Sequence, residues 1–140
     1  MLQFLHEKAV RFNGNILGFE EFDEFAITAV EENSPYAYLQ SMQDENIGFL
    51  VVVPFVFYPE YTFELEDKDK TLLELRSQEE VAILNMVTIR EPYTKSTVNL
   101  LAPLVINIGN GHARQVVLPP RSNYGTSEPL FKAVLKESGE

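Results

Sequence analysis

The sequence predicts a mostly β protein: a small antiparallel β-barrel-like domain with one or two short helices. Short runs of β-branched and aromatic residues recur along the chain, and turn-forming residues separate them at intervals of about 8–12 residues, as in barrels and sandwiches. Segments with helical periodicity are scarce. The 140 residues, 45% of them hydrophobic, suffice for one core. We therefore expect a single domain spanning residues 1–140, with a frayed tail from about residue 133.

The predicted strands begin with Phe25–Val30, which a polar turn at residues 31–35 ends. Residues 36–42 and 47–53 follow, and the four polar residues between them predict a hairpin. Residues 61–66 alternate, which predicts a strand with Tyr61, Phe63 and Leu65 facing inward.

The later strands are predicted at residues 81–90, 104–108 and 114–118. The first is apolar on both faces, as expected of a central strand covered on each side. Gly109-Asn110-Gly111-His112 separates the other two, and its Asn-Gly pair predicts a hairpin.

Two short helical segments are predicted between residues 67 and 80. Asp67 is placed to cap a helix that runs to Leu75, with Leu72 and Leu75 on its inner face. Ser77-Gln78-Glu79-Glu80 has the form of a capping box, and the β-branched run that follows leaves room for only about one turn.

The net charge of −10 is unevenly distributed. Between Phe12 and Asp67 there is no Lys or Arg, but there are twelve carboxylates: Glu20, Glu21, Asp23, Glu24, Glu31, Glu32, Asp44, Glu45, Glu60, Glu64, Glu66 and Asp67. Such a chain repels phosphate backbones, which argues against direct nucleic-acid binding. The acidity serves either solubility alone or the attraction of a basic protein partner, and composition does not decide between them.

The sequence contains no recognised catalytic motif. Cysteine is absent, His6 and His112 lie far apart, and no nucleophile-elbow, phosphate-loop or metal-ligand motif occurs. The acidic residues at 20–24 lack the spacing and glycine of a calcium loop. We therefore expect no catalytic residue, no metal and no cofactor. No signal peptide or membrane-spanning segment is evident, so we expect a cytoplasmic protein that does not bind membranes.

The most distinctive segment runs from Phe49 to Leu65. It holds six aromatic residues within fifteen positions, and Pro54 and Pro59 prevent continuous strand pairing. Most of these aromatic side chains are expected in the core. A bend between the prolines would expose Tyr58 beside Glu60, a pairing common at protein-binding hot spots.

This segment, together with residues 99–107 and Gln115–Leu118, resembles the bacterial flagellar assembly factor family FliW. Residues 18–20 and 39–41 fit the same pattern in order. One departure is Val53, where the family pattern commonly has an acidic residue before the proline.

The resemblance implies a non-catalytic regulatory protein with a small β-barrel-like fold. Such a protein binds the translational regulator CsrA, a basic RNA-binding protein, and relieves its repression of flagellin translation. It also binds flagellin as the competing partner, which couples flagellin level to flagellum assembly.

The resemblance also suggests where the partners bind. We expect the CsrA contact around Tyr58, Glu60, Tyr61, Glu64, Glu66 and Asp67. Pro54, Phe57, Pro59, Asn99 and Asn107 belong to the family motif, and for the two asparagines a buried structural hydrogen bond is favoured over partner contact. We expect a monomer when the protein is alone.

Two other functions remain open at the level of sequence. A small-ligand-binding β-barrel would have a sizeable apolar cavity inside, whereas the bulky Phe, Leu and Val content indicates a filled interior. A hydrolase with an unrecognised carboxylate pair would have two adjacent acids with strongly shifted pKa values in a cleft.

Overall fold

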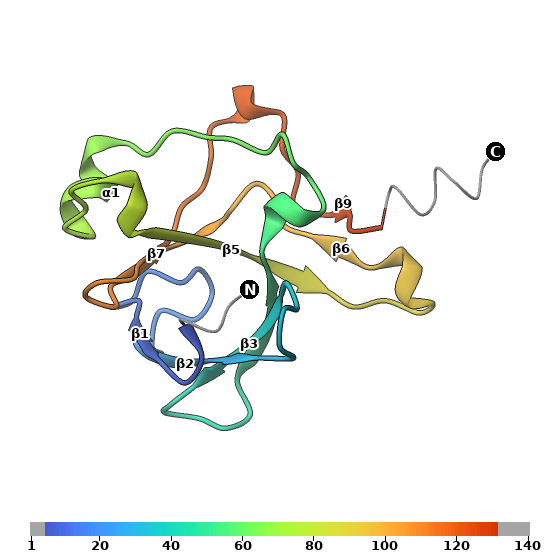
Figure 1. The fold of residues 1–140 in the computed structure, drawn as a ribbon, viewed down its shortest axis with the longest axis horizontal. Helices are drawn as coiled ribbons and strands as arrows, with labels where there is room; N and C mark the ends of the chain where they lie inside the picture. Colours follow the sequence, from blue (N-terminus) through green and yellow to red (C-terminus); the bar gives the residue numbers. More distant parts are fainter. Residues whose placement is uncertain (1–4, 132–140) are drawn as a thin grey trace.

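The computed structural model describes residues 5–131 of the chain. Nine strands in this range form one antiparallel sheet that curls around a core (Figure 1). The strands are β1 (Ala9–Arg11), β2 (Glu24–Ala29), β3 (Tyr36–Ser41), β4 (Gly48–Val52), β5 (Val81–Thr88), β6 (Thr97–Val98), β7 (Leu104–Asn107), β8 (Ala113–Gln115) and β9 (Glu128–Pro129). One α-helix, α1 (Asp67–Leu72), and the 3₁₀ turns η2 (Pro54–Val56), η3 (Gln78–Glu80), η4 (Tyr93–Lys95) and η5 (Pro120–Ser122) complete the described part.

Strands β1 to β5 pair in chain order, and β5 is the hub of the sheet. One edge of β5 pairs with β4, and the other pairs with β7 along residues 81–84 and with β6 along residues 87–88. Strand β8 pairs with β7, and β9 pairs with β6. A single bridge between Arg11 and His112 brings β1 close to β8 without a continuous ladder. The predicted antiparallel, barrel-like fold is confirmed.

The inner face of the sheet encloses one hydrophobic cluster, termed the inner core. Its members are aliphatic or phenylalanine side chains at most 2% exposed: Leu5, Val10, Phe12, Ile16, Phe25, Ile27, Ala37, Leu39, Val51, Leu84, Leu104, Ile106 and Ala113. The rings of Phe12 and Phe25 meet edge to face, with centroids 5.6 Å apart. These bulky side chains fill the interior, which is the packing that the sequence composition predicts.

The outer face of β5 and β7 is covered by two irregular segments, residues 54–80 and 116–131. In Figure 1 they form the green and orange arches above β5. Beneath them lies a second cluster, termed the outer cluster, whose buried members are Val52, Tyr61, Leu73, Val98, Leu100, Val105, Val116, Leu118 and Leu130. Along β5, Leu84 belongs to the inner core, whereas Ile83 packs against the outer cluster. The prediction of a central strand covered on both faces is confirmed.

The hairpins are also confirmed. Strands β3 and β4 pair from Gln40–Gly48 to Tyr36–Val52, and β7 pairs with β8 around the predicted Asn-Gly turn. Gly111 in that turn has a φ of +80°, and a Cβ there would lie 3.1 Å from the carbonyl oxygen of Ala9. Only glycine meets both demands without strain.

Two local predictions are wrong. Residues 61–66 are extended, with Tyr61 buried and Glu64 exposed as the alternation requires, but they form no strand. The helix begins after Glu66, its N-cap, and ends at Leu72. Leu72 is 54% exposed, and the side chain that turns inward is that of Leu73. The left-handed φ of +55° at Glu74 stops the helix before Leu75.

The predicted capping box is confirmed around η3. The Glu80 carboxylate accepts the backbone N–H groups of Arg76 and Ser77 at 2.9 and 3.0 Å, so a single turn precedes β5. Within residues 5–131, no helix has the length and apolarity needed to cross a membrane. The tail predicted to fray from about residue 133 lies outside the described residues.

Candidate partner-binding site

The predicted partner-binding residues lie on one segment, from the end of β4 to the start of α1. Pro54 is buried and opens η2, which turns the chain away from the sheet. Phe57 is half-buried, and its ring centroid lies 6.0 Å from those of Tyr36 and Phe131. The bend predicted between Pro54 and Pro59 is therefore present, and its aromatic residues fix it to the body of the protein.

The bend exposes a different aromatic residue from the one predicted. Tyr58 is half-buried, and its hydroxyl donates a hydrogen bond to the carbonyl oxygen of Pro129 at β9. Burial raises the pKa of Tyr58, and the nearby charge of Glu128 raises it further. The side chains that project into solvent are Phe55 and Val56, 42% and 47% exposed.

Tyr61 is only 4% exposed and anchors the segment to the sheet. Its hydroxyl donates to the carbonyl oxygen of Leu100 at 2.6 Å and accepts the side-chain N–H of Asn85 at 3.3 Å. Asn85 also donates to the carbonyl oxygen of Asn99 at 2.8 Å. Burial, the largest influence, raises the pKa of Tyr61 to about 12. Tyr61 therefore links residues 54–80, termed the arch, to β5 and to the connection between β6 and β7.

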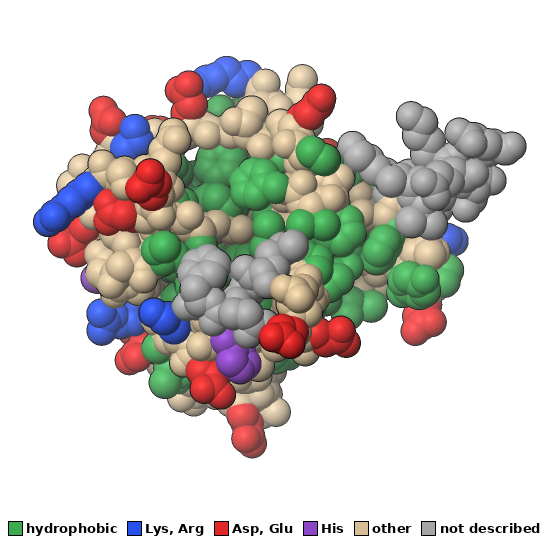
Figure 2. Space-filling view, viewed as in Figure 1, with side chains coloured by type: hydrophobic (Ala, Val, Ile, Leu, Met, Phe, Trp, Pro, Cys, Tyr) green, Lys and Arg blue, Asp and Glu red, His purple; other side chains and the backbone are tan. Residues whose placement is uncertain are grey.

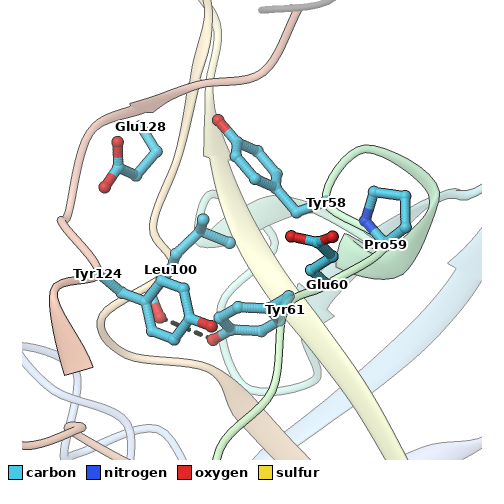
Figure 3. Close-up of a pocket in the computed structure, with 7 residues that line it drawn as sticks. All are labelled: Tyr58, Pro59, Glu60, Tyr61, Leu100, Tyr124 and Glu128. Carbon is cyan, nitrogen blue, oxygen red and sulfur yellow. Dashed lines mark hydrogen bonds between the residues drawn. The ribbon is translucent and has the colours of Figure 1, made fainter.

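A pocket of about 590 Å³ opens beside Tyr61, and it is termed the tyrosine pocket (Figure 3). Its lining residues are Tyr58, Pro59, Glu60, Tyr61, Leu100, Tyr124 and Glu128. The rings of Tyr61 and Tyr124 meet edge to face with centroids 4.7 Å apart. In Figure 3, Glu60 and Glu128 stand on opposite sides of the space between the aromatic rings.

Tyr124 takes the place of a neighbouring strand for the extended segment. Its hydroxyl accepts the backbone N–H of Thr62 at 3.1 Å and donates to the carbonyl oxygen of the same residue at 3.2 Å. One side chain thus satisfies both backbone groups that a sheet ladder would otherwise pair. At Thr62 the segment is therefore held without a neighbouring strand, although residues 61–66 keep the burial pattern of one.

The four predicted carboxylates Glu60, Glu64, Glu66 and Asp67 are all exposed along this segment. Glu64 also borders a second hollow, of about 820 Å³, between the arch, α1 and β5. Figure 2 shows the hydrophobic floor of this hollow. The floor includes Phe63, Leu75 and Ile83.

Asp69 carried no functional prediction and behaves differently from its acidic neighbours. It is 2% exposed and forms an ion pair with Arg114 of β8, whose Nε lies 2.8 Å from Oδ1 of Asp69. The only sequence signal was its position, one helical turn before Leu73. The pair attaches α1 to the sheet.

The carboxylate-rich part of the sequence forms more than one acidic surface. Asp23 donates its backbone N–H to the side chain of Gln43 at 2.6 Å, so the 20–24 turn lies beside the turn between β3 and β4. The carboxylates at 60–67 belong to the arch on the other side of the inner core. A partner would meet these as separate acidic regions.

The two motif asparagines have structural roles. Asn107 is 2% exposed, donates to the carbonyl oxygen of Leu73 at 2.8 Å and accepts the backbone N–H of Gly109 at 2.8 Å. Asn99 accepts the backbone N–H of Ala102 at 3.0 Å. The favoured interpretation, a structural hydrogen bond, is the one these contacts support. In the described range, no three His, Asp or Glu side chains converge to hold a metal ion.

Comparisons with known proteins agree with this architecture. The family described as FliW protein matches residues 1–130. The flagellar assembly factor FliW of Bacillus subtilis (strain 168) is 40% identical over 124 residues, which cover 89% of this chain and 86% of that protein. The FliW of Oceanobacillus iheyensis is 41% identical over 131 residues, covering 94% and 88%. A crystal structure of the flagellar assembly factor FliW superposes with a TM-score of 0.82 at 35% identity, covering 90% of this chain and 88% of that one.

Proposed function

This chain belongs to the FliW family of flagellar assembly factors, and from that premise we propose that it is a non-catalytic regulatory protein of the cytoplasm. It binds the translational regulator CsrA, relieves the repression of flagellin translation, and binds flagellin as the competing partner. Free flagellin would then occupy the protein, release CsrA and reduce further flagellin synthesis.

The observation that carries the proposal is the exposed acidic arch. Four exposed carboxylates project from a segment that is anchored at Tyr61 and at α1. They are Glu60, next to the first anchor, and Glu64, Glu66 and Asp67. A basic partner would be attracted to this surface, and because the backbone that carries the carboxylates is anchored, little chain entropy is lost on binding. Attraction of this kind weakens as salt screens the charges.

The test is calorimetric titration of the protein with CsrA and with flagellin, followed by competition between the two. We expect both to bind and flagellin to displace CsrA. The double variant Glu64→Lys and Asp67→Lys should weaken CsrA binding, most clearly at low salt. Glu31→Lys with Glu32→Lys, on the exposed turn between β2 and β3, makes the same charge change elsewhere and is the matched control.

Two results would contradict the proposal. If neither CsrA nor flagellin bound the intact protein, the function would be wrong. If both bound but the arch variant and its control behaved alike at low and moderate salt, the placement of CsrA on the arch would be wrong.

A further inference from the structure

The tyrosine pocket combines aromatic walls with carboxylates that have no cationic partner among residues 5–131. Within this range, the contacts of up to 4.0 Å between a basic side chain and a carboxylate are Arg114–Asp69 and the two histidine contacts His6–Glu7 and His112–Glu74. Neither Glu60 nor Glu128 takes part in them. The faces of tyrosine rings carry negative electrostatic potential, so rings and carboxylates in this pocket attract the same kind of ligand.

The walls of the pocket are fixed before any ligand arrives. Each of the three tyrosine hydroxyls donates to a backbone carbonyl on another segment: Tyr58 to Pro129, Tyr61 to Leu100 and Tyr124 to Thr62. The hydroxyls are thereby engaged in the framework, and the rings contribute their carbon surfaces to the pocket. A site held in this way requires little ordering when a ligand binds.

Glu128 is fixed too, yet it keeps its charge available. Its Oε2 accepts the backbone N–H of Gly125 at 2.9 Å, and this bond holds the carboxylate against the turn that precedes β9. The negative charge of Glu128 reaches the pocket, since it raises the pKa of Tyr58. Glu60 faces it from the opposite wall and is exposed. A ligand that enters between them meets negative charge from two sides.

We infer that the tyrosine pocket receives an arginine side chain of a protein partner, an inference that rests on the proposed protein-binding function for the nature of the ligand. A guanidinium group is planar, so it stacks on tyrosine rings while its N–H groups bond to carboxylates in a forked arrangement. The volume of about 590 Å³ accommodates such a side chain with part of its backbone. A lysine ammonium would meet the charge but would not stack.

The pocket is tested directly with an acetylated and amidated Gly-Arg-Gly peptide, titrated into the ¹⁵N-labelled full chain. The backbone amides of Gly125 and Thr62 are the reporters, because they bond to Glu128 and to Tyr124. We expect both resonances to shift in a saturable manner. The same peptide with citrulline, which keeps the shape but lacks the charge, should bind at least about fivefold more weakly, the scale of one cation–π or partly exposed ion-pair contact.

The matching variant is Glu128→Gln, which preserves an acceptor for Gly125 and removes the charge. We expect it to weaken the arginine peptide about fivefold, and Glu45→Gln on the β3–β4 turn, an equal change of charge, to leave it unaltered. The inference is overturned if the Gly125 and Thr62 amides do not move, if the citrulline peptide binds as well, or if the two variants behave alike.

Titration with CsrA separates this inference from the proposed function. Wild-type binding to CsrA together with a silent peptide titration would overturn the pocket and leave the function intact. A saturable, charge-dependent peptide titration without binding of CsrA or flagellin would support the pocket and overturn the proposed partners.

Discussion

The inner core and the outer cluster share the central strand β5 but are closed in different ways. The inner core is enclosed by sheet ladders, and its side chains are aliphatic or phenylalanine. The outer cluster lies under irregular chain. The side chains of Asn85 and Asn107 attach that chain to β5 and β7, and the hydroxyl of Tyr124 joins its two segments to each other. Burial thus stabilises both faces of β5, and on the outer face side-chain hydrogen bonds also hold the covering chain in place. The surface proposed to meet partners is on the second face.

The largest effect should come from Leu84→Ala, which empties part of the inner core. Leu84 is fully buried on β5, and truncation of a leucine in a close-packed interior costs about 2–5 kcal/mol of the free energy of unfolding. Leu118→Ala, at 3% exposure in the outer cluster, should fall at the low end of that range because its partly buried neighbours can close the gap. Urea unfolding of both variants measures the difference. Equal losses would show that the two clusters do not differ in packing.

Asn107→Ala should follow in size. The substitution removes the N–H group 2.8 Å from the buried carbonyl oxygen of Leu73, which keeps only a 3.4 Å contact with the side chain of Asn110, and it removes the acceptor of the N–H of Gly109; a poorly satisfied buried group costs about 1–3 kcal/mol. Because both contacts end at α1 and the 109–111 turn, amide exchange should accelerate there more than in β2 and β3. Uniform acceleration over the whole chain would contradict a role in local attachment.

Tyr61→Phe should be destabilising by about 1 kcal/mol, the net value of a typical hydrogen bond. It should also change the alkaline limb of the stability curve. The pKa of Tyr61 is raised to about 12 from the ordinary value of 10.0, so the folded state keeps a proton that the unfolded state loses. This contribution is complete below pH 10 and is lost as the pH rises toward 12. The free energy of unfolding, measured between pH 10 and pH 12, should fall less steeply with pH in the variant than in the wild type. Equal slopes for the two proteins would show that Tyr61 does not cause the loss.

Leu72→Gln should have the smallest effect, within about 0.5 kcal/mol, as for an exposed site. Sequence periodicity placed Leu72 on the inner face, whereas the structure exposes 54% of it. Leu73→Gln, at 2% exposure in the outer cluster, is the neighbouring control and should be far more destabilising. If thermal melts showed the opposite order, Leu72 and not Leu73 would be the side chain that α1 turns inward.

The sheet was largely predictable because hairpin signals are local. The β3–β4 and β7–β8 hairpins and both covered faces of β5 follow from turn residues and hydrophobic periodicity. Strands β6 and β9, of two residues each, carry too short a pattern to be seen. Residues 61–66 show that periodicity predicts burial better than strand pairing: they alternate in burial, yet the backbone of Thr62 bonds to the hydroxyl of Tyr124 and not to a strand.

Of the candidate site, the sequence predicted only the residues that are adjacent in the chain. Tyr58, Glu60 and Tyr61 were identified because they are neighbours in sequence. Tyr124 and Glu128 complete the same pocket, but they come from the C-terminal segment, and no sequence spacing relates them to the arch. For the acidic residues the opposite holds, because carboxylates that the sequence groups into one stretch lie on separate surfaces. Asp69, close by in sequence, turns inward to Arg114.

The single bridge between Arg11 and His112 has a consequence for the order in which the fold assembles and opens. The hairpins join residues close in the chain, whereas residues 11–17 and 111–115 are far apart in it. They are joined by the bridge, by the 2.8 Å bond from the N–H of Arg11 to the carbonyl oxygen of Gly111, and by bonds of Gln115 with Asn15 and Leu17 at 3.0 and 2.8 Å. Closure of so long a loop costs more entropy than formation of a hairpin, and it is slower. The contact between β1 and β8 should therefore form last during folding. It should also open first, while β1 stays paired with β2 through residues 9–11.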